Sequence, residues 1–365
     1  MMAIFTDVLY DVTKKGKKLP TNEYKESGRY PIIDQGQNDI AGYTNETEGL
    51  FCDVPAIIFG DHTRSIKYVD TPFFIGADGV KILKAKNESA NYKFLYYALS
   101  SANIPNTGYN RHFKWLKEVD IPVYTAQEQI KIVTEIDKIT YLIDLRKQQL
   151  QQLDELVKAR FVEMFGNAEN KIPISEMCNV TGGYSFKSGD ISNDGAIKIL
   201  QIGNVYLDNV NWDTINYLPE GFDEKYSRFL LNEGDIVVAL TRPIIQSLGN
   251  VKACIVKSSD LPCLLNQRVG RIVPKKDKNV LLEFIYGCLM TDDFTRYVES
   301  CSIGCSQPNI STKDIENYLI PSATHAKQME YVEFKKQTDK SKFAVQQSLE
   351  KLETLKKALM QEYFG

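Results

Sequence analysis

The sequence is poor in the residues that most often build catalytic and metal centres. Its 365 residues include three histidines, His62, His112 and His325, and seven cysteines. The cysteines are odd in number, lie in apolar contexts and include no CxxC pair, so neither a disulfide framework nor a zinc site is predicted. We expect reduced thiols, with Cys301 and Cys305 buried, and no metal.

Sequence signatures of catalysis are also missing. There is no P-loop, no GxGxxG after a strand, no HExxH and no GxSxG nucleophile elbow. No two prolines are adjacent, which excludes the Asn-Pro-Pro-aromatic motif of adenine methyltransferases. We therefore expect a protein that has no catalytic centre and needs no cofactor.

Long apolar runs and a surplus of basic charge are absent as well. No stretch reaches the roughly 18 to 20 apolar residues of a membrane span, and MMAIFTDVLYDVTKK lacks the order of a signal peptide, so a cytoplasmic location without membrane contact is expected. The net charge is −3, and residues 1–120 carry fifteen basic and fifteen acidic side chains. Any contact with DNA should therefore be local or shared with a partner subunit.

What the sequence does contain is an internal repeat. Residues 121–166 align without a gap onto residues 320–365, an offset of 199. The shared residues include the opening Ile-Pro, one glutamine, three leucines and the closing Phe-Gly: Ile121-Pro122 with Ile320-Pro321, Gln129 with Gln328, Leu150, Leu153 and Leu156 with Leu349, Leu352 and Leu355, and Phe165-Gly166 with Phe364-Gly365. The two halves of the chain are therefore copies of one another.

Each copy of the repeat predicts a long helix. After Ile-Pro, no glycine or proline interrupts the sequence until the closing Phe-Gly. The first copy also has a coiled-coil seam with spacings of three and four, interrupted by Arg146 and Arg160. The seam residues are Ile136, Ile139, Ile143, Leu150, Leu153, Val157 and Met164.

The segments before the helices predict two α+β domains, because both mix short β-rich runs with glycine turns. In residues 1–120 we expect strands at 30–33, 56–59 and 80–83, then an apolar helix KFLYYALSS. In residues 167–319 we expect strands at 197–202, 235–240 and 269–273, then the apolar helix LLEFIYGCLMT. The predicted parts are domains 1–120 and 167–319 and spacer helices 121–166 and 320–365.

The length of the helices suggests a molecular ruler. A helix of about 40 residues is on the order of 60 Å long, near two turns of duplex DNA. If the halves are related by a pseudo-two-fold axis, their helices run antiparallel and pair as a coiled coil. Such a protein suits a ligand with two separated sites.

These features resemble the specificity subunits of type I restriction-modification systems. The helix resemblance rests on Ile121-Pro122, Glu128-Gln129, Ile132-Val133 and the ending LDELVKARFVEMFG. In the first domain it is carried by YPIIDQGQNDIAGYTNE, PAIIFGDHTRSIKYV and FFIGADGVKIL. In the second it is carried by GYSFKSGDISNDGAIKILQIGNV, NEGDIVVALTR, LLNQRVGRIVP and SIGCSQPNIS. The second helix departs from the family pattern, with His325-Ala326-Lys327-Gln328 where a Pro-rich turn and Glu-Gln are common.

The resemblance implies a division of labour. Each domain would read one half of a bipartite target in double-stranded DNA, while the helices would fix the spacing and dock two methyltransferase subunits. Restriction subunits would join through that complex. Methyl transfer to adenine and ATP-driven cleavage would be supplied by those partners.

Residues that could read DNA are polar side chains in loops next to strand ends. Arg, Lys, Asn and Gln match base edges, whereas phosphate contacts only position the protein. In the first domain the candidates are His62, Thr63, Arg64, Arg111, His112 and Lys114; in the second they are Lys187, Arg242, Gln246, Asn266, Gln267, Arg268, Gln307 and Asn309.

Alternatives remain open for several of these residues. Trp115 and Phe113 could be core residues flanked by solvated lysines, and 266–268 could satisfy backbone groups beside a buried strand. Gln35, Gln37 and Asn38 could form only a hairpin turn. A different class of function is also open: a coiled-coil scaffold that bridges two protein partners without touching DNA.

Overall fold

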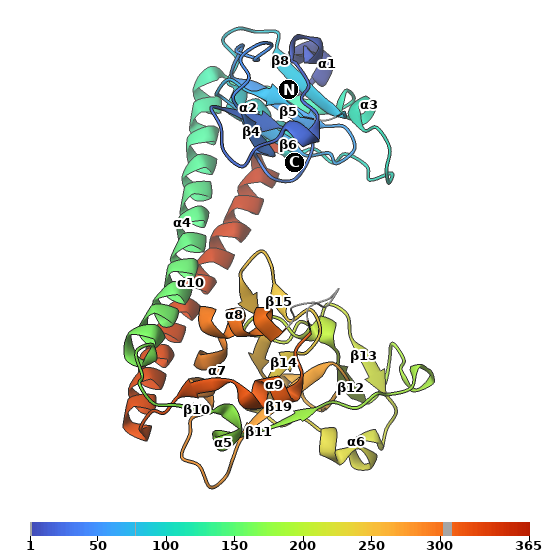
Figure 1. Ribbon diagram of the computed structural model, residues 1–365. Helices are drawn as coiled ribbons and strands as arrows, with labels where there is room; N and C mark the ends of the chain where they lie inside the picture. The colour runs from blue at the N-terminus through green and yellow to red at the C-terminus, as the bar shows by residue number, and fades with distance from the viewer. Residues whose placement is uncertain (1, 77, 302–308) are drawn as a thin grey trace. The chain divides into compact units, whose positions relative to one another are not determined.

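A computed structural model describes residues 2–76, 78–301 and 309–365. The chain forms two compact units: unit 1 comprises Met1–Gln148 and Gln346–Gly365, and unit 2 comprises Gln149–Val345. Helices α4 (Ala126–Phe165) and α10 (His325–Phe364) each contribute one end to unit 1 and the other to unit 2. Figure 1 shows the helices and strands of both units.

Unit 1 is built on a four-stranded antiparallel sheet in the order β2-β8-β5-β6. All five residues of its strand β5, AIIFG, are buried. Ile57 and Phe59 pack into one hydrophobic core and Ala56 and Ile58 into another, because successive side chains leave a strand on opposite faces. A second sheet has the order β4-β3-β7, and β1 pairs with β9. The elements are β1 (Met2–Ile4), α1 (Phe5–Val8), β2 (Leu9–Asp11), β3 (Tyr30–Ile33), β4 (Gly42–Thr44), β5 (Ala56–Gly60), β6 (Ile66–Val69), β7 (Phe74–Ile75), β8 (Val80–Ala85), α2 (Tyr92–Ser101), α3 (Phe113–Leu116) and β9 (Asp120–Pro122).

Unit 2 repeats this construction. Its four-stranded sheet has the order β11-β19-β14-β17, and all four residues of β14 are buried. Ile236 and Val238 pack into one core and Val237 and Ala239 into another. The elements are β10 (Lys171–Pro173), α5 (Ile174–Met177), β11 (Cys178–Gly182), β12 (Ile197–Leu200), β13 (Asn216–Leu218), α6 (Phe222–Lys225), β14 (Ile236–Ala239), β15 (Ile244–Ile245), β16 (Asn250–Val251), β17 (Ala253–Ile255), β18 (Cys263–Leu265), β19 (Val269–Pro274), α7 (Leu282–Leu289), α8 (Asp292–Cys301), α9 (Thr312–Asn317) and β20 (Leu319–Pro321).

The strand connections establish that the two units share one topology. The smaller sheets, β4-β3-β7 and β13-β12-β18, each combine one antiparallel and one parallel pair in the same order. The β1-β9 pair corresponds to β10-β20. Unit 2 adds the hairpin β15-β16 and helix α8 to this common topology.

The two long helices obey the sequence repeat, since both of their ends differ by the offset of 199 residues. Inside each unit they run antiparallel. In unit 1, Tyr363 donates to Glu135 Oε2 at 2.7 Å. In unit 2, Arg160 Nη2 donates to Glu330 Oε1 at 2.7 Å, and Lys342 pairs with Asp154. All seven predicted seam positions of α4 are buried or half-buried.

The repeated Phe-Gly has a packing role. Phe364, at the end of α10, lies 5.3 Å from Phe94 of α2 between ring centroids, inside unit 1. Phe165, at the end of α4, lies 5.0 Å from Phe284 of α7, inside unit 2. Each long helix therefore ends in the core of the unit formed by the other half of the chain.

The repeated glutamine closes the turn at the start of each helix. Gln129 Nε2 donates to the carbonyl of Tyr124 at 3.0 Å, and Gln328 Nε2 donates to that of Ala323 at 2.9 Å. Gln328 is also buried, and its Oε1 accepts from the backbone N–H of Leu281 at 2.8 Å. These hydrogen bonds satisfy backbone carbonyls in the turn after the Ile-Pro pair, where the carbonyls have no partner in a regular helix or strand.

The expected strands and apolar helices are present, with two corrections to the sequence-based expectations. The strand predicted for 197–202 ends at Leu200, because Asn204 Oδ1 accepts from the backbone N–H of Gln201 at 2.9 Å and closes a 3-10 turn there. Cys301 is half-buried rather than buried, and Cys305 lies outside the described residues.

Two further observations concern membranes and metals. Within residues 2–76, 78–301 and 309–365, no helix is long and apolar enough to cross a membrane. In the same part of the chain, no group of three or more His, Cys, Asp or Glu side chains is arranged to hold a metal ion.

Candidate nucleic-acid interface

Three loops meet at one end of the four-stranded sheet in unit 1. The turn after β5 joins the residue before β8, because Asp61 N–H donates to the carbonyl of Gly79 at 2.6 Å. The loop before α3 joins the same turn, because His112 N–H donates to the carbonyl of Asp61 at 2.8 Å. We call residues 61–65, residue 79 and residues 105–112 loop junction 1.

Unit 2 has the same arrangement, with the same two hydrogen bonds. Leu240 N–H, after β14, donates to the carbonyl of Arg268 at 2.8 Å, and Ile310 N–H donates to the carbonyl of Leu240 at 2.9 Å. Thr241 and Asn309 also form a β-bridge. We call residues 240–246, 266–268 and 309–310 loop junction 2. The backbone therefore places corresponding loops together in both copies.

Most residues that the sequence proposed for DNA contact belong to these junctions. Loop junction 1 contains His62, Thr63, Arg64, Arg111 and His112, and Lys114 lies two residues after it. Arg242, Gln246, Asn266, Gln267, Arg268 and Asn309 lie in loop junction 2. Gln307 lies outside the described residues, and Lys187 lies away from the junction.

Three of the candidate arginines have a left-handed backbone. The φ angle is 63° at Arg64, 48° at Arg242 and 68° at Arg268, and Asp208 is the remaining described non-glycine residue with positive φ. This conformation costs a residue with a side chain roughly 1–2 kcal/mol. Backbone strain of this kind tends to gather at binding sites, where it aims a side chain. Gly79, with φ of 90°, occupies the position of Arg268 in loop junction 1.

The exposure of these arginines differs. Arg242, Arg268 and Arg111 are exposed, so their guanidinium groups are available to a ligand. Arg64 is half-buried, and its Nη1 donates to the carbonyl of Ile104 at 3.1 Å. Arg64 therefore also braces the loop that leads to α3.

His112 is a brace for the loop and not a surface group. It is 0% exposed, its Nδ1 donates to the carbonyl of Asp61 at 2.9 Å, and its Nε2 lies 3.4 Å from the backbone N–H of Thr107. The tautomer with hydrogen on Nδ1 satisfies both contacts. The side chain of Asp61 is buried too, and its Oδ1 accepts from Phe113 N–H at 2.7 Å.

The basic residues after His112 have mixed roles. Lys114 is exposed, with its ammonium 4.0 Å from the ring centroid of Trp115. Trp115 and Phe113 are half-buried and pack against the core of unit 1, as the alternative reading of this segment predicted. Lys114 therefore presents its charge at the surface, where the ammonium makes a cation–π contact with Trp115.

The exposed carboxylate of Asp78 offsets part of the positive charge near loop junction 1. Lys18 Nζ lies 2.7 Å from Asp78 Oδ1. This hydrogen bond and the Lys18 charge lower the pKa of Asp78, and the charge of Arg111 lowers it further. Asp78 thus partly neutralises two basic side chains, which agrees with the balanced charge of the first domain.

The β3-β4 loop, residues 34–41, is hydrogen-bonded to loop junction 1. Gln35 Oε1 accepts from His62 N–H at 3.2 Å, and Thr63 Oγ1 donates to the carbonyl of Gln35. The buried Lys67 donates to the carbonyls of Asp34 and Asn38. Gln37 and Asn38 are exposed in a connection between antiparallel strands, so the hairpin reading of this segment is confirmed.

Sequence reasoning missed the role of Lys67. The charged amine sits 3.6 Å from Asp34 Oδ1 and holds the loop in shape, although burial lowers the pKa of Lys67 against the opposing effect of Asp34 and Asp39. The alternating pattern of strand β6, IKYV, was the only available signal, because it points Lys67 inward with Val69.

Loop junction 2 borders a polar groove of about 510 Å³. Asn266 is 8% exposed, and its backbone N–H donates to the carbonyl of Leu200 at 3.1 Å. Gln267 and Arg268 are exposed and line the groove together with Asn211. The far wall is held by Asn204, whose Nδ2 donates to the carbonyls of residues 211 and 214.

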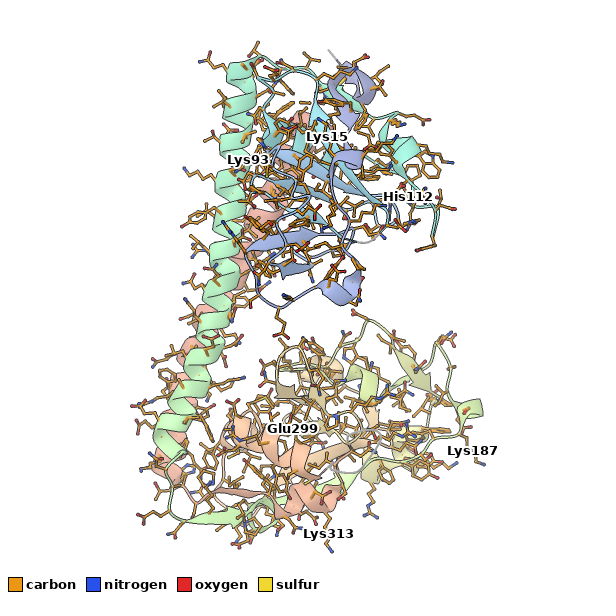
Figure 2. The ribbon with its side chains drawn as sticks, turned by 45° about the horizontal axis from the view of Figure 1, so that its top comes forward. Lys15, Lys93, His112, Lys187, Glu299 and Lys313 are labelled. Carbon is orange, nitrogen blue, oxygen red and sulfur yellow. The ribbon has the colours of Figure 1, made fainter. Side chains whose placement is uncertain are left out.

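The remaining candidates are spread over unit 2. Gln246 and Asn309 are exposed, the former in the turn of hairpin β15-β16. Lys187 is exposed and precedes a 3-10 turn, and Figure 2 shows it at the edge of the unit.

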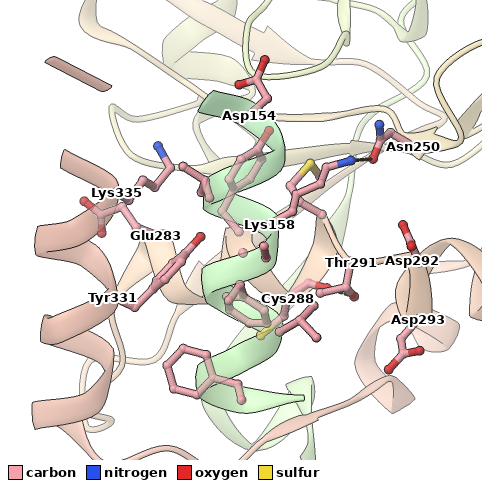
Figure 3. A pocket seen from close by; sticks show the side chains of 18 of the residues that line it. Asp154, Lys158, Asn250, Glu283, Cys288, Thr291, Asp292, Asp293, Tyr331 and Lys335 are labelled. Carbon is pink, nitrogen blue, oxygen red and sulfur yellow. Dashed lines mark hydrogen bonds between the residues drawn. The ribbon is translucent and has the colours of Figure 1, made fainter. Parts of the chain in front are cut away.

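A larger cavity of about 1430 Å³ lies elsewhere in unit 2, among α4, α10, α7 and α8. Figure 3 shows Lys158 of α4 bonded to Asn250 of strand β16, at 2.7 Å. Acidic residues such as Asp154 and Asp292 line it beside lysines, so it is not a surface that attracts a polyanion.

Comparison with known proteins gives a consistent result. The family described as type I restriction modification DNA specificity domain matches residues 6–155 and 169–356. The specificity subunit of the type I restriction enzyme MjaVIII from Methanocaldococcus jannaschii is 29% identical over 317 residues, which cover 79% of this chain and 74% of the relative. The EcoR124I/EcoR124II specificity subunit of Escherichia coli is 24% identical over 337 residues, covering 85% and 80%.

Solved structures share the fold. The type I S subunit from M. genitalium superposes with a TM-score of 0.56 at 16% identity, covering 100% of this chain and 96% of that one. A chain from a study of complex assembly and conformational transition of the type I R-M system gives 0.58 at 14% identity, covering 100% and 97%.

Proposed function

Because the chain belongs to the family of type I restriction-modification DNA specificity subunits, we propose that it reads a split target in double-stranded DNA. Specificity subunits are generally the non-catalytic components of these systems. Each copy of the repeat reads one half of the target, with residues 1–120 and 167–319 as the recognition domains. Residues 121–166 and 320–365 form the spacer helices, paired as an antiparallel coiled coil.

One observation carries this proposal: the loop junction occurs twice. Both junctions gather the same three loops with the same two backbone hydrogen bonds, and exposed polar side chains differ between them. A fixed backbone frame with different side chains suits two half-sites of unlike sequence. Arg242, Arg268 and Gln267 can reach base edges in junction 2, and Arg111 and Lys114 can contact phosphate in junction 1. His112 acts by holding the loops of junction 1 in position.

We further propose that two methyltransferase subunits dock on the long helices and that restriction subunits join through them. Support comes from exposed apolar residues at repeat-related positions. Ile130 and Met329 are 61% and 45% exposed, and Leu156 and Leu355 are 48% and 47% exposed. Each pair differs by the offset of 199. Apolar positions repeated in this way fit two copies of one partner.

The test is methylation mapping in a host without DNA methylation. The chain is expressed with its methyltransferase partner, and the partner alone serves as the control. We expect a split motif of modified adenines only when both proteins are present. If the proteins co-purify and no new modification appears, the chain is a scaffold between proteins and the DNA-reading role is wrong.

A further inference from the structure

Loop junction 1 carries an aromatic ring that the fold leaves largely exposed. Tyr109 is 87% exposed, in a loop next to Arg111. Burying such a ring stabilises a protein, and the chain forgoes that gain here. Single exposed apolar residues are common at protein surfaces, but Tyr109 is distinguished by how its ring is held.

The ring is held flat on a second ring. Tyr109 and His62 are stacked, with 4.6 Å between their centroids and 8° between their planes. His62 N–H donates to Gln35 Oε1 at 3.2 Å. Behind His62 lies Gly79, where an added Cβ would come within 2.9 Å of His62 Cδ2 and 2.6 Å of Gln35 Oε1. Because Gly79 has no side chain, it leaves the space that the His62 ring occupies.

The loop that presents Tyr109 is also braced. Gly108 N–H donates to Asn106 Oδ1 at 3.2 Å, and Asn110 N–H donates to the carbonyl of Gly108 at 2.8 Å. Gly108 has φ of 77°, which allows the turn just before the tyrosine. The buried His112 anchors the end of the loop. Tyr109 thus has one face on His62 and the other open to solvent.

We propose that the open face of Tyr109 stacks on a nucleobase of the half-site read by unit 1. This inference rests on the proposed function and adds a residue that recognises base planes instead of base edges. A flat ring accepts any base, because every base has a π-face. Arg111 follows Tyr109 by two residues and is exposed, so its charge suits a phosphate next to that base.

Stacking requires that a base be unstacked on one side, so Tyr109 acts as a wedge at one base step. Aromatic and apolar side chains open such steps in other DNA-binding proteins. Loop junction 2 differs here, because the position of Gly79 is taken by Arg268. We therefore expect the wedge in one half-site and not in the other.

The test uses the full chain in complex with its methyltransferase partner and DNA that carries the mapped target. Pyrimidines of each half-site are replaced one at a time by 5-iododeoxyuridine or 5-iododeoxycytidine, which cross-link to stacked aromatic side chains on irradiation. We expect a cross-link to the peptide containing Tyr109 from one position in one half-site.

Affinity gives the second readout. Tyr109→Ala should weaken target binding by about 5- to 150-fold, the range expected for loss of one base-aromatic stack. Tyr109→Phe and Tyr109→Trp should stay within about threefold of the original chain, and Tyr109→Leu should fall between. Tyr10→Ala is the matched control, because Tyr10 is 42% exposed and pairs with Lys84 at the far end of β8.

Three results would overturn the proposal. If Tyr109→Ala binds as tightly as the original chain while Arg242→Ala weakens binding, the wedge is wrong and the DNA-reading role stands. If Tyr109→Ala releases the methyltransferase subunit, the ring contacts protein. If the unmodified complex binds no DNA sequence selectively, both the wedge and the proposed function fail.

Discussion

At the scale of single residues, a left-handed backbone distinguishes candidate DNA-contacting arginines from other charged residues at the surface. The chain has 44 basic Lys and Arg side chains, most of which need no explanation beyond solubility. Arg242 and Arg268 differ because both are exposed, both are at positive φ and both border the same three-loop junction. The strain indicates that their direction matters.

Arg242 therefore provides the first residue-scale prediction. Arg242→Ala should weaken binding to one half-site by about 1–3 kcal/mol if the arginine reads a base. Changes in the other half-site should be recognised as before. The measurement is equilibrium binding of the chain with its methyltransferase partner to targets altered in one half at a time.

The matched control for Arg242 is Arg296→Ala. Arg296 lies on α8, its side chain is 68% exposed and it pairs with Asp293, so the same charge is removed away from the junction. Uniform loss across all sequences in Arg242→Ala would identify a phosphate contact instead of a base contact.

His112 provides a second prediction, because its burial separates folding from recognition. His112→Ala removes a buried ring and its bonds to Asp61 and Thr107, and should destabilise the protein by about 2–4 kcal/mol. His62→Ala removes a half-buried ring and should destabilise it less. Thermal unfolding measures both variants. Equal, small effects would contradict the bracing role of His112.

At the scale of elements, the two long helices begin differently despite their common origin. Thr125 and Glu128 form a capping box: Thr125 N–H and Oγ1 donate to Glu128 Oε2 at 2.8 and 2.7 Å, and Glu128 N–H approaches Thr125 Oγ1 at 3.3 Å. The second helix has Thr324 but carries Lys327 where Glu128 stands in the first. Only α4 therefore has the acidic residue that completes a capping box.

This difference predicts a pH dependence. The hydrogen bonds from Thr125, first from its side chain and then from its backbone, lower the pKa of Glu128 below 4.5. A carboxylate with a lowered folded-state pKa stabilises the fold above its unfolded-state pKa, and the contribution disappears as the pH falls through the folded-state value. Melting temperatures of the original chain and Glu128→Gln should therefore differ at pH 7, and the difference should disappear as the pH falls from 4.5 through the folded-state pKa. A difference independent of pH would mean that the charge plays no part.

Strand and helix positions follow closely from sequence because each element has a clear pattern. Strand β3 covers Tyr30–Ile33 as predicted, and α2 and α7 form where apolar helices were expected. The strand predicted for 197–202 was too long, because side-chain bonding by Asn204 closes a turn that apolar content alone does not reveal.

At the scale of the whole molecule, the repeat gives the chain two long helices of equal length. If these helices set the spacing between half-sites, lengthening both should lengthen the target. Seven residues add about 10 Å of helix, which corresponds to about three base pairs. Seven is also one heptad, so the apolar seam stays in register.

The test inserts one heptad after Gln148 and one after Val345, so that both helices grow while the pairs Asp154–Lys342 and Arg146–Ser348 are kept. Methylation mapping should then find the same two half-sites separated by about three more base pairs. Insertion in one helix alone serves as the control and should abolish modification, since the seams no longer match. An unchanged spacer with both insertions would mean that the helices do not determine spacing.

The sequence alone determined the duplication, the two long helices and three strands in each domain, because these depend on periodicity and on residues a few positions apart. Most of the loop residues that it proposed for DNA contact lie at the two junctions, since polar residues after buried strands can be recognised in the sequence. Which of them act as braces was decided by tertiary structure.

His112 and Asn266 read as surface polar groups in the sequence, yet their burial follows from loops that meet over long separations. The same holds for Lys67, whose amine is held by carbonyls about thirty positions away. Tyr109 is the reverse case: an aromatic residue is left exposed and stacked on a histidine from another loop. Burial is a property of neighbours in space, and only the folded chain supplies them.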